Sequence, residues 1–494
     1  MSFYYKLKIQ DRDSARVRAE KQRIADRLLA LREALDEHIQ NSPHSETCGE
    51  ENHSRALEEG HSDDSSRMLR LATWNIREFD SNKFGSRLDE SFYYIAEIIS
   101  RFDLVAIQEV REDLTALEKV VRILGKNDWS FIATDVTEGS GGNRERMVFV
   151  YNRKKVWFRN VAGELVLPAA QTITYPHEER VAFNRAMRLS LPEGGSLEPP
   201  KTVEVRKRSG KAYLKEEVAI ELPDGTSVEL PPGCSVVLPK GYEVELTKDG
   251  TMKVPAGAKV QFRETGKNKE PMVRLPKGAI VGESLQFART PAMVAFQCGW
   301  LKLYLCTVHI YYGSDRDGLR RRRDEIRSLT KFLSQRAARE NDTDGDSFFL
   351  VLGDFNIVDK SHDTMKALNT NGFKVPEALH TLPGSNVDKT KSYDQISFWT
   401  DPRGKGFSSN TVTSLEVHRA GIFDFFETVF REGPHDSGGR DEKLYISRDD
   451  YEDRWKYRDW RTFQMSDHLP MWIELRVDFG DEYLEQIRDH DQAT

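Results

Sequence analysis

The chain has 494 residues, which is too long for one ordinary hydrophobic core, so we expect two or three domains. Charged residues make up 31% of the sequence and the mean hydropathy is -0.62, as is typical of a globular protein with a large polar surface. The formal net charge of -7 excludes a basic field over the whole molecule. Binding of nucleic acid would therefore depend on a local basic patch or on metal ions.

The sequence lacks the features of membrane and secreted proteins. No uninterrupted apolar run approaches the roughly 20 residues needed to span a bilayer. The N-terminal stretch MSFYYKLKIQDRDSARVR has no apolar segment followed by a small-residue cleavage site. The cysteines Cys48, Cys234, Cys298 and Cys306 do not have metal-type CxxC spacing. We therefore expect free thiols and a cytoplasmic protein without a membrane partner.

Residues 1–40 are expected to form an N-terminal amphipathic helix. Ile24 and Leu31 share one heptad position, and Leu28 and Leu35 share the other, with charged residues between them. This pattern fits a helix docked on its own protein as well as it fits an arm for self-association.

Strand-like and helix-like segments alternate through most of the remaining chain. Residues 41–66 are rich in Ser, His, Glu and Asp with little to bury, so we expect a polar linker there. Apolar runs that suit buried strands then alternate with amphipathic runs that suit helices, over 67–160 and again over 285–480. This alternation is typical of α/β folds. We expect the two stretches to form one α/β core, followed by a C-terminal tail over 481–494.

Residues 161–284 interrupt that pattern and are rich in Val, Leu, Pro, Gly, Lys and Glu. An eight-residue repeat begins at Ile220 with IELPDGTS and continues as VELPPGCS, VVLPKGYE, VELTKDGT, MKVPAGAK and VQFRETGK. Each unit combines a short apolar strand with a turn, in most units with Pro to preset one turn residue and Gly to supply positive φ. We expect an inserted all-β module, either a small β-solenoid or a β-meander, with a structural or partner-binding role.

Polar side chains that suit catalysis lie next to several of the expected strands. They are Asn75, Glu109, His309, Asp354, Asn356, Asp467 and His468. In α/β sheets, ligand sites gather at the carboxyl ends of strands. Taken singly, each residue has an ordinary explanation as a solvated charge, a turn former or a cap. Their occurrence together in one chain indicates a site.

Four short motifs, WNIR, QEVR, GDFN and SDH, follow one another in that order, each next to an apolar strand. This set resembles the endonuclease/exonuclease/phosphatase superfamily. The segments NIREF, LVAIQEVRED, NRERMVFVYNR, ARTPAMVAF, YDQISF and SDHLPMW look most like deoxyribonuclease I. The resemblance covers about 69–158 and 285–479, and it implies a four-layer α/β sandwich in which two packed β-sheets are flanked by helices.

The resemblance further implies a divalent-metal-dependent phosphodiesterase, with an endonuclease acting on DNA as the leading hypothesis. Glu109, Asn75 and Asp467 resemble a metal site, and oxygen ligands of this kind suit Mg²⁺ or Mn²⁺. His468 resembles the general base that activates a water molecule. Asp394 resembles the carboxylate that orients this base.

A second imidazole–carboxylate pair is also part of the resemblance. His309 and Glu145 resemble the pair that protonates the departing oxygen. Asp354 and Asn356 would position the water and the phosphate. The basic residues expected to bind the substrate are Arg111, Arg289 and Arg144.

Three features leave alternatives open. Asn143 stands where deoxyribonuclease I has a tyrosine that stacks in the minor groove, so single strands and RNA stay open as substrates. The segment RDDYEDRWKYRDWRTFQM mixes positive charge with aromatic rings, and it fits either binding of bases and phosphates or packing on the core. The arginines of a helix expected over 319–339 fit a solvated face better than a phosphate-binding face.

Two other functions compete with a nuclease. A phosphomonoesterase or lipid phosphodiesterase of the same superfamily would use the same metal site. A scaffold that only binds would not need two imidazole–carboxylate pairs together with a metal carboxylate, so we favour an enzyme. The expected partners are nucleic acid, with DNA in first place, and a protein or second copy of the chain bound through the β insert or the N-terminal helix.

Overall fold

The computed structural model divides into two compact units. The first comprises Met1–Leu165, Ala288–Tyr311 and Ile326–Thr494, and the second comprises Val166–Phe287 and Tyr312–Glu325. The structure describes residues 4–43, 67–79, 81, 85–136, 144–166, 171–174, 179–182, 187–191, 194–198, 201, 203–206, 210–223, 227–230, 233–239, 241–261, 272–275, 280–283, 287, 289–313, 316–343, 347–403, 415–432, 439–448, 451 and 456–490.

The first unit is built on two six-stranded sheets, and the first of these has the strand order β24-β25-β1-β2-β4-β3. Its strands are β1 (Met68–Phe79), β2 (Leu104–Val110), β3 (Trp129–Ala133), β4 (Arg146–Asn152), β24 (Val417–Ile422) and β25 (Met471–Arg476). β1 pairs parallel with β2 and antiparallel with β25. The apolar runs read from the sequence form these strands because most residues of β1 and all but one of β2 are buried.

The second sheet has the order β22-β23-β21-β20-β19-β5. Its strands are β5 (Trp157–Glu164), β19 (Ala292–Cys298), β20 (Leu301–His309), β21 (Ser347–Asp354), β22 (Phe373–Lys374) and β23 (Asp394–Trp399). β20 and β21 are parallel, and the other pairs are antiparallel. Residues 161–164, which we expected at the start of the insert, belong to β5 of this core sheet.

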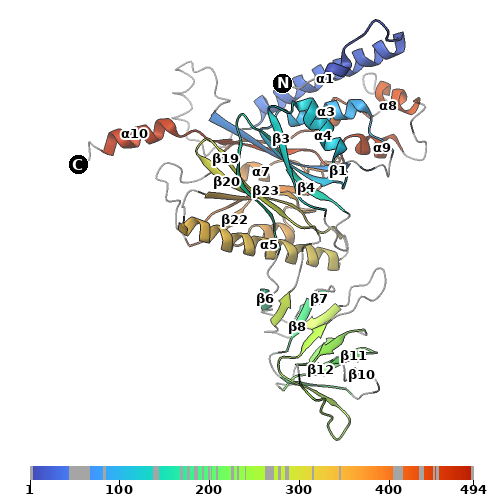
Figure 1. Cartoon of the computed structure of the whole chain (residues 1–494), viewed down its shortest axis with the longest axis vertical. Helices are drawn as coiled ribbons and strands as arrows, with labels where there is room; N and C mark the ends of the chain where they lie inside the picture. Colours follow the sequence, from blue (N-terminus) through green and yellow to red (C-terminus); the bar gives the residue numbers. More distant parts are fainter. Residues whose placement is uncertain are drawn as a thin grey trace. The chain divides into compact units, whose positions relative to one another are not determined.

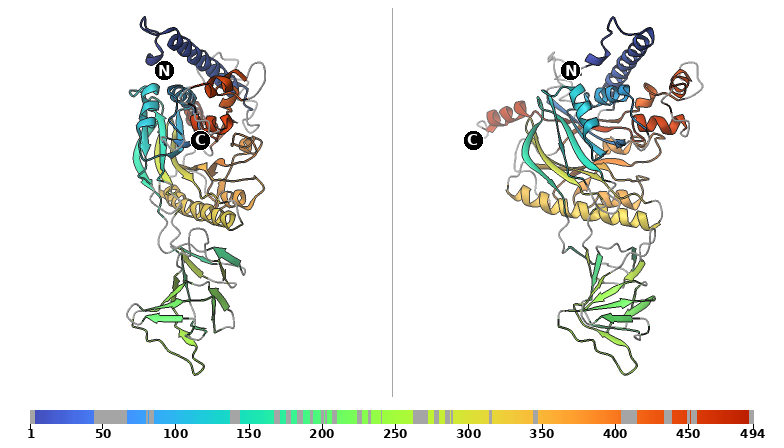
Figure 2. Two further views of the ribbon diagram at one scale, coloured as in Figure 1. Left: turned by 90° about the vertical axis from the view of Figure 1, so that its right-hand side faces the viewer. Right: turned by 45° about the vertical axis from the view of Figure 1, so that its right-hand side comes forward.

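The two sheets pack face to face through their central strands, and helices cover the outer faces (Figure 1 and Figure 2). α3 (Asp89–Ile99) and α4 (Thr115–Leu124) lie on the first sheet. α5 (Arg316–Thr343) lies along the second sheet, where Trp399 of β23 donates a hydrogen bond to Ser334. The remaining helices are η1 (Tyr5–Leu7), α6 (Asp363–Leu368), α7 (Glu377–His380), η4 (Phe425–Glu427), α8 (Gly439–Ile446), α9 (Tyr457–Gln464) and α10 (Gly480–His490). The predicted four-layer α/β sandwich is confirmed.

The N-terminal helix α1 (Ala15–Asn41) is docked on the first unit. Its buried residues are Ile24, Leu28, Leu31, Leu35 and Ile39, and the helix contacts α3 and β24. Its ion pairs to the core are Arg23–Glu90, Arg27–Asp441 and Arg32–Glu97. Of the two interpretations of the heptad pattern, the structure therefore supports the docked helix. Within the described ranges, no helix combines the length and apolarity needed to cross a bilayer.

The second unit contains strands that lie within the stretch predicted as an insert. They form a seven-stranded sheet, β10-β11-β14-β16-β8-β18-β6, and a six-stranded sheet, β15-β9-β12-β13-β17-β7. Their bounds are β6 (Gln171–Thr174), β7 (Glu179–Ala182), β8 (Met187–Ser190), β9 (Gly195–Leu197), β10 (Val203–Arg206), β11 (Lys211–Leu214), β12 (Val218–Glu221), β13 (Ser227–Leu230), β14 (Ser235–Val237), β15 (Met252–Val254), β16 (Lys259–Gln261), β17 (Met272–Leu275) and β18 (Ile280–Glu283).

The strands of the second unit follow the repeat units with one exception. Five of the six octapeptides contain a strand, β12 to β16, whereas the unit that starts at Val244 has only an isolated bridge between Leu246 and Met252. Successive strands often change sheet, and the described pairs are antiparallel. The arrangement differs from a single meander, which keeps successive strands side by side, and from the parallel stacking of most solenoids.

Two open questions about basic segments are answered by burial. Tyr457 and Trp460 are buried, and the buried Arg461 pairs with a surface glutamate, so this aromatic segment packs on the core. Arg322 of α5 is fully buried and donates from Nη2 to the carbonyl oxygen of Gly313 at 2.8 Å. The interpretation of the α5 arginines as a solvated face is therefore wrong for Arg322.

Candidate active site

Strand register brings three of the predicted residues into one row across the second sheet. His309 at the end of β20 pairs with Asp354 at the end of β21, and Asp354 pairs in turn with Asp394 at the start of β23. Side chains opposite one another in register point to the same face of a sheet, so the three converge. Gly353 permits this approach, because its φ is 137° and a Cβ there would lie 2.2 Å from the carbonyl oxygen of Val308.

Asn75 and Glu109 reach the site from the first sheet. Both lie at irregularities: the register of β1 shifts between Asn75 and Phe79, and that of β2 shifts between Ile107 and Val110. Glu109 has a φ of 62°, which few residues other than glycine adopt and which is concentrated at functional sites. With this bulge, Glu109 Oε1 accepts a hydrogen bond from Asn75 Nδ2 at 3.0 Å.

A buried chain of charged side chains holds His309. Its Nδ1 lies 2.7 Å from Glu145 Oε2, and Glu145 Oε1 accepts from Arg289 Nε at 3.0 Å. Because the carboxylate engages Nδ1, His309 Nε2 faces the site, 3.4 Å from Asp354 Oδ2. Burial would raise the pKa of Glu145, but His309 and Arg289 outweigh it and lower this pKa to about 2. Burial and Arg289 would lower the pKa of His309, but Glu145 and Asp354 raise it.

His468 forms the second pair, just before β25. Its Nδ1 lies 2.8 Å from Asp394 Oδ2, and its Nε2 lies 3.8 Å from Asp354 Oδ2. Trp74 Nε1 fixes the backbone by donating to the carbonyl oxygen of His468 at 2.9 Å. Burial would lower the pKa of His468, but the charges of Asp394 and Asp354 raise it well above its usual value. Burial raises the pKa of Asp394.

Asp354 links the two pairs. Its Oδ2 accepts from Asn75 Nδ2 at 3.0 Å and faces both imidazoles, and its Oδ1 accepts from the backbone N–H of Asn356 at 2.8 Å. The Asn356 side chain donates to the carbonyl oxygen of Ile310 at 2.8 Å. The residues predicted for the two proton-transfer pairs and for positioning, Glu145, His309, Asp354, Asn356, Asp394 and His468, are thus brought together.

Asn75 and Glu109 offer oxygen atoms that suit a divalent cation. Asn75 Oδ1 is buried and has no hydrogen-bond partner in the described part of the chain, and the Glu109 side chain is 19% exposed. An unpaired buried acceptor calls for a ligand, and hard cations prefer carboxylate and amide oxygens. Burial raises the pKa of Glu109, an effect that a bound cation reverses. These two residues fit Mg²⁺ or Mn²⁺.

A second group of ligand atoms lies beside this one. Asp354, Asp394 and His468 each offer one atom, and the three atoms lie within 4.8 Å of one another. Asp394 Oδ2 and His468 Nδ1 already bond to each other, however, whereas Asn75 Oδ1 has no partner among the described residues. For this reason we favour Glu109 and Asn75 as the metal ligands.

Asp467, the third predicted metal ligand, lies at the rim of the site. Its side chain is 42% exposed, and its Oδ2 lies 3.6 Å from Arg77 Nε. Burial and the charge of Glu145 are the larger causes that raise the pKa of Glu109, and the charge of Asp467 raises this pKa further. Asp467 is therefore near the favoured metal ligands without bonding to them in this structure.

The three arginines predicted to bind substrate all have acidic partners. The pairs are Arg289–Glu145, Arg111–Glu78 and Arg144–Glu112. Arg289 is buried, so in this structure its guanidinium supports the second imidazole pair, which the sequence did not indicate. The side chain of Arg144 is 67% exposed, as a surface contact to substrate requires. Asn143 lies outside the described residues.

Three further residues at the site were not predicted from the sequence. They are Ser385, whose Oγ donates to Asp394 Oδ2 at 2.6 Å; Glu78, whose N–H donates to Glu109 Oε2 at 2.8 Å; and Ser466, whose Oγ donates to the carbonyl oxygen of Asn75 at 2.6 Å. Glu78 and Ser466 lie within the NIREF and SDH motifs, so their position in the sequence could have indicated that they lie at the site. Ser385 lies in a loop that carries no motif.

Replacing Glu145 by glutamine should flatten the acid side of the stability profile. The pKa of Glu145 is about 2 in the folded protein against an ordinary 4.5, so the ionised carboxylate stabilises the fold above pH 4.5 and this contribution is lost as the pH falls towards 2. The loss is about 1 kcal/mol at about pH 3.5 and about 3 kcal/mol at full protonation. Urea unfolding of both proteins from neutral to acid pH measures the difference. Parallel profiles would contradict this expectation.

The chain is similar to known proteins over part of its length. No family model matches the chain. The chain is 37% identical over 91 residues to deoxyribonuclease-1 of Equus caballus and 36% identical over 91 residues to that of Bos taurus. The resemblance to deoxyribonuclease I is confirmed. Each match covers 18% of this chain and 32% or less of the relative, so the chain matches about a third of the length of these curated relatives.

The similarities to solved structures are more distant. An endonuclease/exonuclease/phosphatase family protein from Bacteroides thetaiotaomicron is 15% identical with a TM-score of 0.37, over 83% of this chain and 97% of that one. A mannosyl-6-phosphatase from the same organism is 14% identical with a TM-score of 0.38, over 82% of this chain and 99% of that one. D. rerio TDP2 complexed with single-strand DNA product is 11% identical with a TM-score of 0.38, over 83% and 98%. Similarities of this size carry no conclusion about activity.

Proposed function

We propose that this protein is a divalent-metal-dependent phosphodiesterase that hydrolyses nucleic acid, with DNA as the first substrate to test. One observation carries the proposal: two imidazole–carboxylate pairs, His468–Asp394 and His309–Glu145, meet at Asp354. Hydrolysis of a phosphodiester requires a base for the water and an acid for the leaving oxygen, and two such pairs beside oxygen ligands for a cation can supply both.

His468 is suited to the role of base. Asp394 accepts the proton that we assign to Nδ1 from the hydrogen-bond pattern, and this leaves the Nε2 lone pair directed into the site. A divalent cation held by Glu109 and Asn75 would polarise the phosphate and offset the surrounding negative charge. With that charge offset, the pKa of His468 would fall towards its usual value, and Nε2 could accept a proton from water.

His309 is suited to the role of acid. Glu145 engages Nδ1, and the raised pKa of His309 favours the imidazolium, whose Nε2–H can donate to the departing oxygen. Arg289 fixes the other oxygen of Glu145, so the carboxylate cannot rotate away. Asp354 and the Asn356 backbone bonded to it would hold the water and phosphate between the two imidazoles.

The similarity to deoxyribonuclease I favours an endonuclease, and the oxygen ligands favour Mg²⁺ or Mn²⁺. Arg144 at the surface is the arginine best exposed for contact with a phosphate backbone. The described cysteines, Cys234, Cys298 and Cys306, are free thiols, which supports the expected cytoplasmic location.

A panel of substrates tests the proposal. Purified protein is incubated with plasmid, linear duplex, single-stranded DNA, RNA and a phosphomonoester, with Mg²⁺, Mn²⁺ or EDTA. We expect metal-dependent cleavage of DNA that EDTA stops. Turnover of the monoester alone would favour a phosphatase instead. If every substrate stays intact with and without metal, the enzymatic proposal is wrong and a binding function takes its place.

A further inference from the structure

The buried Ser385 is bonded to Asp394, the partner of the proposed base His468, and to the backbone of Leu469, which follows that base. Its Oγ donates to Asp394 Oδ2 at 2.6 Å and accepts from the Asp394 backbone N–H at 2.9 Å. Its carbonyl oxygen accepts from the N–H of Leu469, the residue after His468, at 2.7 Å. Because the hydroxyl accepts one N–H, its own proton is left to point at the carboxylate.

The loop that carries Ser385 is fixed at several points. Ser385 N–H donates to the carbonyl oxygen of Lys391 at 2.8 Å, and Val387 N–H donates to that of Asp467 at 3.0 Å. Gly384 packs so closely that a Cβ would lie 2.5 Å from the backbone nitrogen of Lys391. The loop between Gly384 and Lys391 is therefore a rigid support next to the predicted base.

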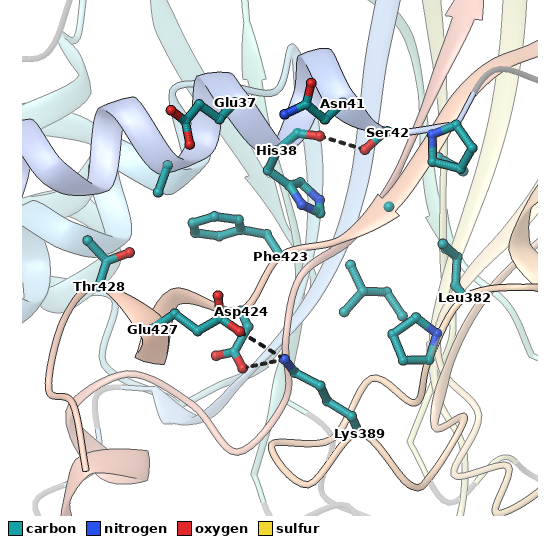
Figure 3. Close-up of a pocket in the computed structure, with 16 residues that line it drawn as sticks. Glu37, His38, Asn41, Ser42, Leu382, Lys389, Phe423, Asp424, Glu427 and Thr428 are labelled. Carbon is teal, nitrogen blue, oxygen red and sulfur yellow. Dashed lines mark hydrogen bonds and ion pairs between the residues drawn. The ribbon is translucent and has the colours of Figure 1, made fainter. Parts of the chain in front are cut away.

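An ion pair ties the far side of this loop to the first sheet. Lys389 Nζ lies 2.9 Å from Asp424 and 3.2 Å from Glu427, both in the segment after β24. Figure 3 shows these three side chains at the pocket below the end of α1, with Leu382 across the pocket. The loop thus joins the core at one side and Asp394 at the other.

We propose that Ser385 is a positioning residue for the His468–Asp394 pair, an inference that rests on the proposed function. Asp394 Oδ2 receives both the imidazole and the hydroxyl, while its Oδ1 is buried without a partner among the described residues. The serine hydroxyl fixes which oxygen of Asp394 faces His468 and thereby fixes the imidazole ring. Without the hydroxyl, the carboxylate is free to rotate and His468 loses its orientation.

Steady-state kinetics of three variants test this role. Ser385→Ala should lower kcat by about 10- to 100-fold, the size expected for a hydrogen bond to a charged group, with KM nearly unchanged. Ser385→Thr keeps the hydroxyl and should restore most of kcat. Ser397→Ala is the matched control, because Ser397 is a buried serine on the same strand as Asp394 whose Oγ has no partner in the described part of the chain. This control should keep wild-type kcat.

A second measurement does not depend on turnover. The His468 Nδ1–H in a hydrogen bond to a buried carboxylate should give a low-field proton resonance, identified by its loss in His468→Gln. We expect Ser385→Ala to shift or broaden this signal and Ser397→Ala to leave it unchanged. If the wild type hydrolyses no phosphodiester, the proposed function is wrong. The resonance still tests whether Ser385 positions the His468–Asp394 pair. An unchanged resonance and unchanged kcat in Ser385→Ala, or equal losses in Ser397→Ala, would overturn the proposal.

Discussion

Replacing His468 by glutamine should lower kcat for phosphodiester hydrolysis by about 10²–10⁴-fold, because a general base contributes a factor of this size. Ser385 still donates a hydrogen bond to Asp394 in this variant, whereas glutamine cannot accept a proton at neutral pH. The buried carboxylate therefore keeps a partner, and we expect the melting temperature to change little. Initial rates on plasmid DNA at saturating metal, with circular dichroism of the same samples, measure both effects.

A histidine outside the site provides the control for this experiment. His380 of α7 is half-buried, and its Nε2 lies 3.2 Å from the carbonyl oxygen of Val375, away from the residues of the site. His380→Ala should therefore keep wild-type kcat. Wild-type rates in His468→Gln would show that another group activates the water. Equal losses in both variants would point to damage of the fold rather than of the chemistry.

The core fold could be predicted because its strands and helices have strong local patterns. Four apolar runs of the sequence are buried strands along almost their whole length, as their composition predicts. These runs end in Asn75, Glu109, His309 and Asp354. Once β20 and β21 are parallel neighbours, His309 and Asp354 fall in register. The four motifs were therefore enough to predict that these strand-end residues would meet, whereas Glu145 and Asp394 were predicted only from the resemblance to deoxyribonuclease I.

Other features depend on tertiary contacts that no local pattern encodes. Arg289 resembles a phosphate-binding residue, yet it lies buried against Glu145, which is 144 residues away in the chain. Ser385 acts on Asp394 through a loop whose shape is fixed by Lys391 and Asp467. In the insert, the octapeptide spacing predicts strands, but it does not encode which of the two sheets each successive strand joins.

Replacing Glu109 by glutamine should weaken binding of Mn²⁺ or Mg²⁺ by at least about tenfold, since changes around metal ligands cost 10- to 100-fold in affinity. The amide removes the negative charge but keeps the size of the side chain, so the bond with Asn75 can reorganise and the fold should persist. Titration of Mn²⁺ followed by electron paramagnetic resonance measures the affinity directly. The same protein should need more metal for half-maximal activity.

Glu112→Gln is the matched control, because this carboxylate is three residues away, exposed, and paired with Arg144 at the surface. It should bind Mn²⁺ like the wild type. Normal Mn²⁺ affinity in Glu109→Gln would move the ion to Asp354, Asp394 and His468, whose ligand atoms lie within 4.8 Å of one another. Asp354→Asn would then lose the metal where Glu109→Gln did not. That outcome would also withdraw His468 from the role of base, because its imidazole would be engaged as a ligand.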